Sequence, residues 1–149
     1  MSAALWATCL VIGISSGDTF TAVCNQKVQM KIRLADIYAP EKSQAFWEES
    51  KNSLSTLCLN TQAQIAIQSL DQRRRSVSRV TCNGIDVNAE QLKRGMAWVY
   101  EAKAQDRSLY ALQDKARRTR QGLWGDPMPV PPWQWRYQVQ NTPAEPHAK

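Results

Sequence analysis

The segment R-L-A-D-I-Y-A-P-E, residues 33 to 41, combines residue types that suit chemistry on a phosphate group. We interpret it as the end of a buried strand that delivers Arg33, Tyr38 and Glu41 to one place. An arginine stays charged and can give a phosphate two parallel hydrogen bonds. A carboxylate within hydrogen-bond reach of water can accept its proton. The segment therefore raises two questions: whether these residues form a phosphodiesterase site, and whether Tyr38 weakens it.

The histidine content narrows the chemistry. The only histidine is His147, third from the C-terminus. A Ser-His-Asp triad, a Cys-His dyad and a histidine-rich metal site are therefore excluded. Catalysis would have to use carboxylates, arginines, lysines or cysteines.

Composition indicates one globular domain with a basic surface. The chain has 149 residues, of which 43% are hydrophobic and 21% charged. No stretch of 18 uncharged apolar residues is present, so we expect no membrane-spanning helix and no membrane partner. The net charge of +6 favours an anionic partner such as nucleic acid, an acidic polymer or an anionic surface. A basic charge without a specific partner stays open as the alternative.

The cysteine pattern favours two disulfides, Cys9–Cys24 and Cys58–Cys82. No C-x-x-C pair is present, which argues against zinc and thioredoxin-like redox chemistry. A hairpin turn near Gly17 places Cys9 opposite Cys24, at a Cα separation of about 4.5–5.5 Å that suits a disulfide. The other two cysteines end a helix and a neighbouring strand, so they should also lie close. Four buried free thiols are the alternative.

Disulfides require an oxidising compartment, so we expect a secreted or periplasmic protein, with a cytoplasmic location still open. Residues 1–8 are a poor signal peptide, and we interpret them as a candidate remnant of one. Residues 9–136 form the expected domain, and residues 137–149 a flexible tail. Within that domain, the Pro-rich segment 126–136 is expected to be irregular.

The element order predicts a five-stranded Greek-key barrel of the OB type with about three helices. Alternation and turn residues predict strands over 9–14, 20–24, 28–37, 63–68 and 76–82, with a short one at 97–100. Helices are expected over 43–58 with Ser43 as N-cap, after Asn88 as N-cap to Arg94, and from about Asp106 to Arg120.

Several motifs in this order resemble a staphylococcal-nuclease-like (thermonuclease) domain over essentially residues 9 to 136. They are S-G-D-T, R-L-x-x-I-x-A-P-E, D-x-x-x-R, D-V-N-x-x-x-L-K-R-G-M-A-W-V-Y, Q-G-L-W and P-P-W-x-W-R. The four-cysteine pattern is similar to the exported bacterial branch of that family. The resemblance implies an enzyme that hydrolyses phosphodiester bonds in nucleic acid.

The resemblance also implies roles for individual residues. Arg33 and Arg75 would bind the phosphate, and Glu41 would act as general base. Arg73, Arg74 and Tyr38 are candidates for further substrate contacts.

A Ca²⁺ ion is implied by the same resemblance. Asp18, the Ala39 carbonyl and, through water, Glu41 would hold it. The family's second acidic ligand is replaced by Tyr38, a neutral phenol, and Ser16 stands where another acid is usual. Because charged oxygens set Ca²⁺ affinity, we expect the ion to bind weakly.

We therefore expect a monomeric Ca²⁺-assisted nuclease that hydrolyses DNA, preferably single-stranded, and RNA, with activity weakened by Tyr38. The alternative is a catalytically impaired OB-fold module that binds nucleic acid, in which the loop Arg73–Arg75, with Arg79, tracks the phosphate backbone. A protein-interaction role is a third hypothesis.

Overall fold

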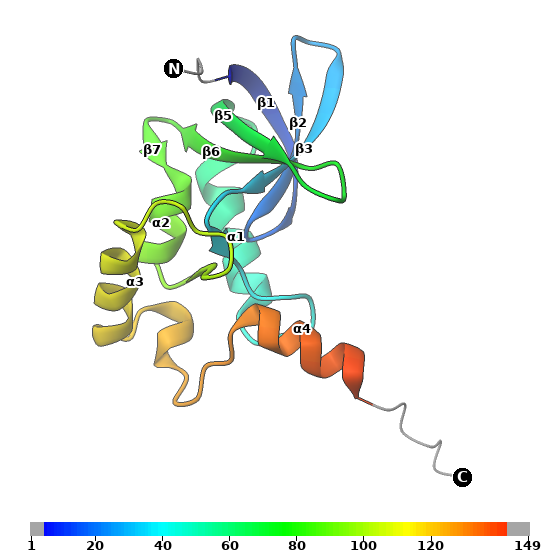
Figure 1. The fold of residues 1–149 in the computed structure, drawn as a ribbon. Coiled ribbons are helices and arrows are strands. Elements are labelled where there is room, and N and C mark those ends of the chain that lie inside the picture. Colours follow the sequence, from blue (N-terminus) through cyan, green and yellow to red (C-terminus); the bar gives the residue numbers. More distant parts are fainter. Residues whose placement is uncertain (1–4, 143–149) are drawn as a thin grey trace.

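A computed structural model describes residues 5–142 and shows a barrel half joined to a helical half (Figure 1). The sheet order is β3-β2-β1-β5-β6-β7, and a parallel pairing of β3 with β6 closes five of these strands into a barrel. The strands are β1 (Leu5–Ser16), β2 (Thr19–Cys24), β3 (Val28–Leu34), β5 (Gln62–Leu70), β6 (Ser76–Cys82) and β7 (Ile85–Asp86). The predicted five-stranded barrel is confirmed, with β7 as a sixth strand.

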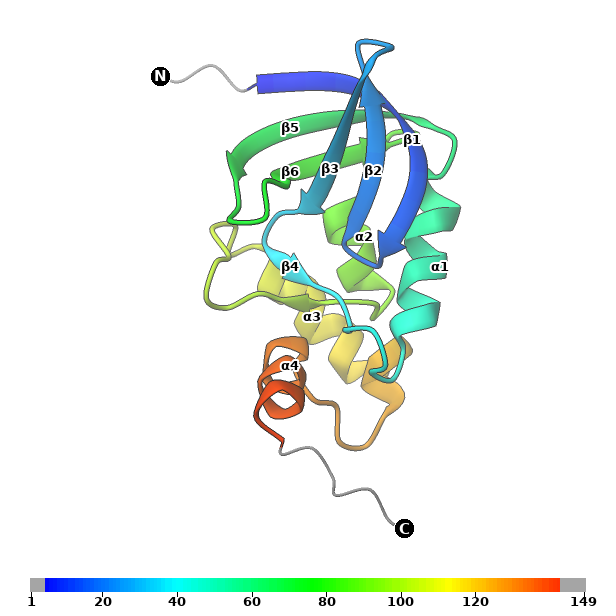
Figure 2. The ribbon, with the colours of Figure 1, turned by 90° about the vertical axis from the view of Figure 1, so that its right-hand side faces the viewer.

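A second, two-stranded sheet follows the barrel strand β3 in the chain. Strand β4 (Ile37–Tyr38) pairs antiparallel with β8 (Trp98–Val99), which sets Tyr38 opposite Trp98. Figure 2 shows β4 directly after the end of β3, above α4. The segment expected as one strand over 28–37 is therefore broken by a turn at residues 35 and 36.

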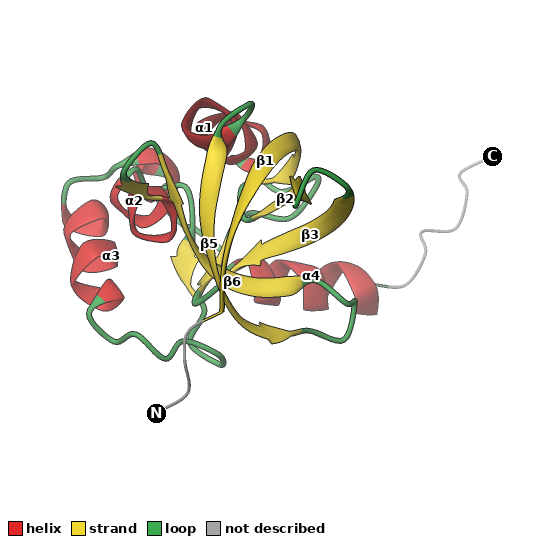
Figure 3. Cartoon of the chain, turned by 90° about the horizontal axis from the view of Figure 1, so that it is seen from above, coloured by secondary structure: helices red, strands yellow, loops and turns green. Residues whose placement is uncertain are grey.

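Residues 5–142 contain four α-helices, where about three were expected. They are α1 (Trp47–Cys58), α2 (Val87–Lys93), α3 (Leu109–Arg118) and α4 (Pro132–Asn141), with a 3₁₀ turn at Gly122–Gly125. Figures 1 and 3 place α3 on one side of the molecule and α4 on the other. Within residues 5–142, none of these helices has both the length and the apolar character needed to cross a bilayer.

Helix α4 corrects the expectation of irregular structure in the Pro-rich segment. Pro132 occupies the first turn of the helix, where a backbone N–H has no intrahelical partner to lose. The residues after it contain no proline up to Asn141, so the helix continues. Residues 137–141, expected as tail, belong to α4; residues 143–149, including His147, lie outside the described part.

Two helix starts also differ from the sequence-based expectation. Helix α1 begins at Trp47 rather than near Ser43, because Phe46 has a left-handed backbone conformation with φ of 70°. The N-cap of α2 is Asp86, whose side chain accepts from the Ala89 N–H. Asn88, expected as the cap, is instead fully buried.

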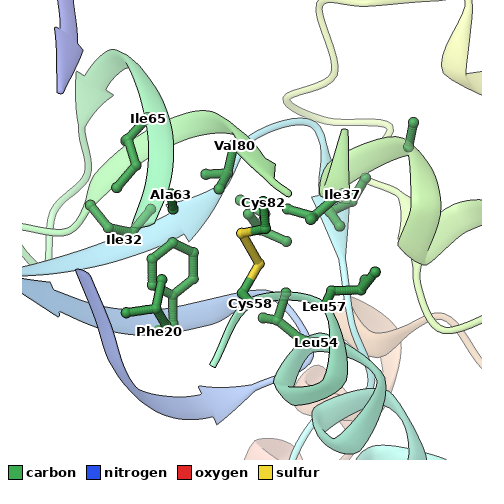
Figure 4. Packing of buried hydrophobic residues seen from close by; sticks show 14 of the residues in the cluster. Phe20, Ile32, Ile37, Leu54, Leu57, Cys58, Ala63, Ile65, Val80 and Cys82 are labelled. Atoms are coloured by element: carbon green, nitrogen blue, oxygen red, sulfur yellow. A yellow bond between two sulfur atoms is a disulfide. The ribbon is translucent and has the colours of Figure 1, made fainter. Parts of the chain in front are cut away.

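Both predicted disulfides are present. Cys9 and Cys24 are directly opposed in the β1–β2 ladder, with Cα atoms 4.3 Å apart. Cys58 at the end of α1 joins Cys82 at the end of β6, with Cα atoms 5.4 Å apart. Figure 4 shows this second bridge inside the core, near Phe20 and Leu54. It therefore ties the helical half to the barrel.

At the N-terminus, residues 5–8 form the first part of β1 and pair with β5. They are thus part of the barrel sheet, although residues 1–8 were expected to be a candidate leader remnant.

Candidate active site

An open cleft of about 960 Å³ gathers nearly all of the expected site residues. Its lining includes Asp18, Arg33, Tyr38, Ala39, Glu41, Arg73 and Arg75. Arg74 is not among the lining residues. Seven lysines and arginines face four carboxylate residues in this lining, so the cleft has an excess of positive charge. Such a cleft suits an anionic polymer.

Asp18 links the turn after β1 to the segment that carries Glu41 through hydrogen bonds. Its Oδ1 accepts hydrogen bonds from the hydroxyls of Ser16 and Thr19, both at 2.9 Å. Its Oδ2 accepts from the Ala39 N–H at 2.8 Å and lies 3.3 Å from Arg33 Nη1. Both carboxylate oxygens are therefore already bonded to the protein.

Arg33 is the penultimate residue of β3 and is buried, with 8% of the residue exposed. Its Nη1 donates to the carbonyls of Leu34 and Ile37, both at 2.8 Å. Its guanidinium also lies over the Tyr38 ring, 5.1 Å from the centroid. Among the described residues all of its hydrogen bonds use Nη1, which leaves Nε and Nη2 for a substrate.

Tyr38 and Glu41 are directly bonded to each other. The Tyr38 hydroxyl donates to Glu41 Oε1 at 2.5 Å. Burial raises the pKa of the Tyr38 phenol, and so does the hydrogen bond to Glu41, while Arg136 acts in the opposite direction. The phenol is therefore neutral at neutral pH and serves as a donor. One oxygen of the expected general base is occupied by it.

The loop between β5 and β6 is organised by Asp71. Its Oδ1 accepts from the backbone N–H groups of Arg73 and Arg75, and its Oδ2 accepts from Arg75 Nε at 2.7 Å. These hydrogen bonds hold the Arg75 side chain at the cleft. The Nη atoms of Arg75 make no hydrogen bond within residues 5–142. Arg74 has a φ of 60° and does not line the cleft.

Arg79, which the alternative binding hypothesis placed along a phosphate backbone, is paired with carboxylates instead. It donates to Asp106 at 2.8 Å and to Asp86 at 2.5 Å, and lies 3.9 Å from Asp36. Asp36 also accepts from the Gln105 N–H. Three carboxylates therefore surround Arg79, and this part of the alternative hypothesis does not match its contacts.

Comparison with known proteins indicates the family of this chain. A family model described as staphylococcal nuclease homologue matches residues 31–126. An "Uncharacterized endonuclease" of Haemophilus influenzae is 40% identical over 131 residues, covering 88% of this chain and 74% of that protein. A "Micrococcal nuclease" of Shigella flexneri is 33% identical over 142 residues, covering 88% of this chain and 81% of that protein. The chain belongs to the staphylococcal nuclease family.

The donor set does not fit the Ca²⁺ site that the resemblance to the staphylococcal nuclease family implies. Ca²⁺ takes six to eight oxygens and depends on carboxylates for affinity. Here Asp18 is saturated by protein donors, and Tyr38 offers a neutral phenol bonded to Glu41. Within residues 5–142, no group of three or more acidic, histidine or cysteine side chains could hold a metal ion.

Sequence reasoning missed Arg136, a residue of this staphylococcal nuclease cleft that lies beside Glu41. Its Nη1 lies 3.8 Å from Glu41 Oε1, and the residue lines the cleft. It was missed because the segment that carries it was expected to be irregular. The motif P-P-W-x-W-R held a usable signal, since proline at a helix start and residues three apart on one face are both readable from sequence.

Proposed function

We propose that this member of the staphylococcal nuclease family is a nuclease that hydrolyses DNA, preferably single-stranded, and RNA. The observation that carries the proposal is the convergence of Arg33, Arg75 and Glu41 on one basic cleft. The names of the relatives, which include endonuclease and micrococcal nuclease, support it. One chain supplies every residue of this cleft, so we propose that a monomer is active.

The reaction follows from the free atoms of these three side chains. A water molecule attacks the phosphorus while Glu41 accepts its proton through Oε2, the oxygen that Tyr38 leaves open. Nη2 of Arg33 and the Nη atoms of Arg75 neutralise the charge that builds up on the phosphoryl oxygens. The bond from phosphorus to the 5′ oxygen breaks, and this oxygen takes a proton from solvent. The products are a 3′-phosphate and a 5′-hydroxyl.

We propose that Ca²⁺ assists this reaction only weakly, because Tyr38 is neutral and Asp18 is saturated by protein donors. A location outside the cytoplasm is proposed from the two disulfides, which form in oxidising compartments.

A second candidate function is binding of single-stranded nucleic acid without cleavage. The hydrogen bond from Tyr38 to Glu41 favours it, because it competes with water for the base. Digestion of heat-denatured DNA by the parent and by Glu41→Gln decides between the two. Cleavage to 3′-phosphate ends that Glu41→Gln abolishes supports the nuclease. Equal binding by both proteins, with no cleavage by either, supports the binding module.

A further inference from the structure

The cleft receives only one residue from the C-terminal quarter of the described chain. Apart from Arg136, every lining residue precedes Asp106. The motif P-P-W-x-W-R, which ends at Arg136, has no role in the mechanism proposed above. Its position beside the general base raises the question of what this guanidinium does.

Helix α4 is held against the cleft by specific contacts. The Gln44 side chain accepts from the Glu41 N–H at 2.9 Å and donates to the Val130 carbonyl at 2.7 Å. It therefore links the loop of the general base to the segment that leads into α4. Trp133 stacks on Tyr100 with ring centroids 5.6 Å apart and an interplanar angle of 14°.

The aromatic contacts of Trp133 also set the orientation of the Arg136 side chain. The Trp133 ring also meets the edge of the Tyr38 ring at 6.0 Å. Residues three apart lie on one face of a helix, so the packing of Trp133 turns Arg136 towards Tyr38 and Glu41.

Arg136 is bound loosely enough to exchange partners. Its distance of 3.8 Å to Glu41 Oε1 is that of an ion pair and exceeds hydrogen-bond range. Its side chain is 38% exposed. A phosphate oxygen entering the cleft would offer a shorter, charge-assisted bond. Tyr38, the residue that replaces an acidic metal ligand in the family pattern, also acts on the Arg136 guanidinium and raises its pKa through a hydrogen bond.

We propose that Arg136 binds the scissile phosphate and supplies the positive charge that a divalent cation would otherwise supply, so that cleavage needs no divalent metal. This inference rests on the proposed nuclease function. Arg136 acts through charge and hydrogen bonding, and the proton still passes from water to Glu41. The side chains of the cleft do not fit a Ca²⁺ ion because, in this proposal, the Arg136 guanidinium supplies the positive charge in its place.

The first experiment measures binding in EDTA. The probe is a single-stranded thymidine oligomer of about ten nucleotides with phosphorothioate linkages, which resist cleavage. Fluorescence anisotropy at several salt concentrations gives the slope of log K against log [salt], which changes by about 0.7 for each phosphate contact on a single strand. Arg136→Gln should reduce this slope by about 0.7. The matched control, Arg118→Gln, alters an exposed arginine on α3 outside the cleft and should keep the parent's slope.

The second experiment measures cleavage of heat-denatured DNA in EDTA and across a Ca²⁺ titration. The parent should cleave in EDTA. The cleavage rate of Arg136→Gln in EDTA should be lower by a factor of about ten or more, and Arg136→Lys should retain part of the parent's rate. Parent cleavage that disappears in EDTA, or an unchanged salt slope in Arg136→Gln, would overturn the inference. Absence of cleavage by the parent under every condition would instead refute the nuclease function. The salt slope is measured on a probe that resists cleavage, so it tests phosphate binding by Arg136 independently.

Discussion

Replacing Tyr38 by aspartate should convert the site into one that responds to Ca²⁺. The substitution restores a carboxylate beside Asp18 and Glu41, and Ca²⁺ affinity rises with each charged oxygen. It also removes the hydroxyl that occupies Glu41 Oε1. Tyr38→Asn is the matched control, because asparagine has nearly the same size and differs only in charge.

The stability cost of both substitutions can be worked from the contacts of the ring. Tyr38 makes edge-on contacts with Tyr100 at 5.0 Å and Trp133 at 6.0 Å, and lies under Arg33 at 5.1 Å. Aromatic pairs contribute about 0.5–1.5 kcal/mol each, and a cation–π contact contributes about 0.5–2 kcal/mol depending on how far it is desolvated. Since the ring is only half-buried, we expect a loss of about 2 kcal/mol. For a domain of this size that lowers Tm by about 4–8 °C.

Ca²⁺ should then separate the two variants. At a concentration of about 100 times Kd, a ligand that binds only the folded state adds about 2.7 kcal/mol. Thermal unfolding should therefore show Tm of Tyr38→Asp returning to near the parent value in Ca²⁺, with none of this recovery in Tyr38→Asn. Cleavage of denatured DNA should rise much more with Ca²⁺ in the aspartate variant than in the parent or in Tyr38→Asn. Equal responses of the two variants would refute the electrostatic reasoning.

Three further outcomes are expected. Arg75→Gln should lower the cleavage rate about a hundredfold, because one charged donor to the phosphate is lost. The control Arg74→Gln alters a residue outside the cleft lining and should change the rate little, and steady-state kinetics compares the two variants. Replacing both Cys58 and Cys82 by alanine should cost about 3–4 kcal/mol of unfolding free energy in urea, since their bridge spans 24 positions; a loss under 1 kcal/mol would contradict this. Burial raises the pKa of Tyr38 above its ordinary 10.0, so its contribution to stability is complete below pH 10 and is lost as the pH rises through the folded-state pKa; denaturation curves of Tyr38→Phe should lack that alkaline loss.

The sequence alone determined the features that depend on local pattern. Alternation along the first strands and the turn near Gly17 place Cys9 opposite Cys24, because the register of a tight hairpin follows from its turn. The order of strands and helices specified the barrel. The motifs, among them the segment that ends at Glu41, indicated the family, since residue types and their spacing are readable without coordinates.

Only the tertiary structure decided how these groups are paired. Whether Arg79 faces a phosphate or carboxylates depends on Asp86 and Asp106, which the chain path brings together. The position of Arg136 depends on packing of α4 and on the Gln44 bond to Val130, which joins residues 86 positions apart. Periodicity and turn chemistry describe neighbours along the chain, whereas such contacts follow from how the packed elements meet in space.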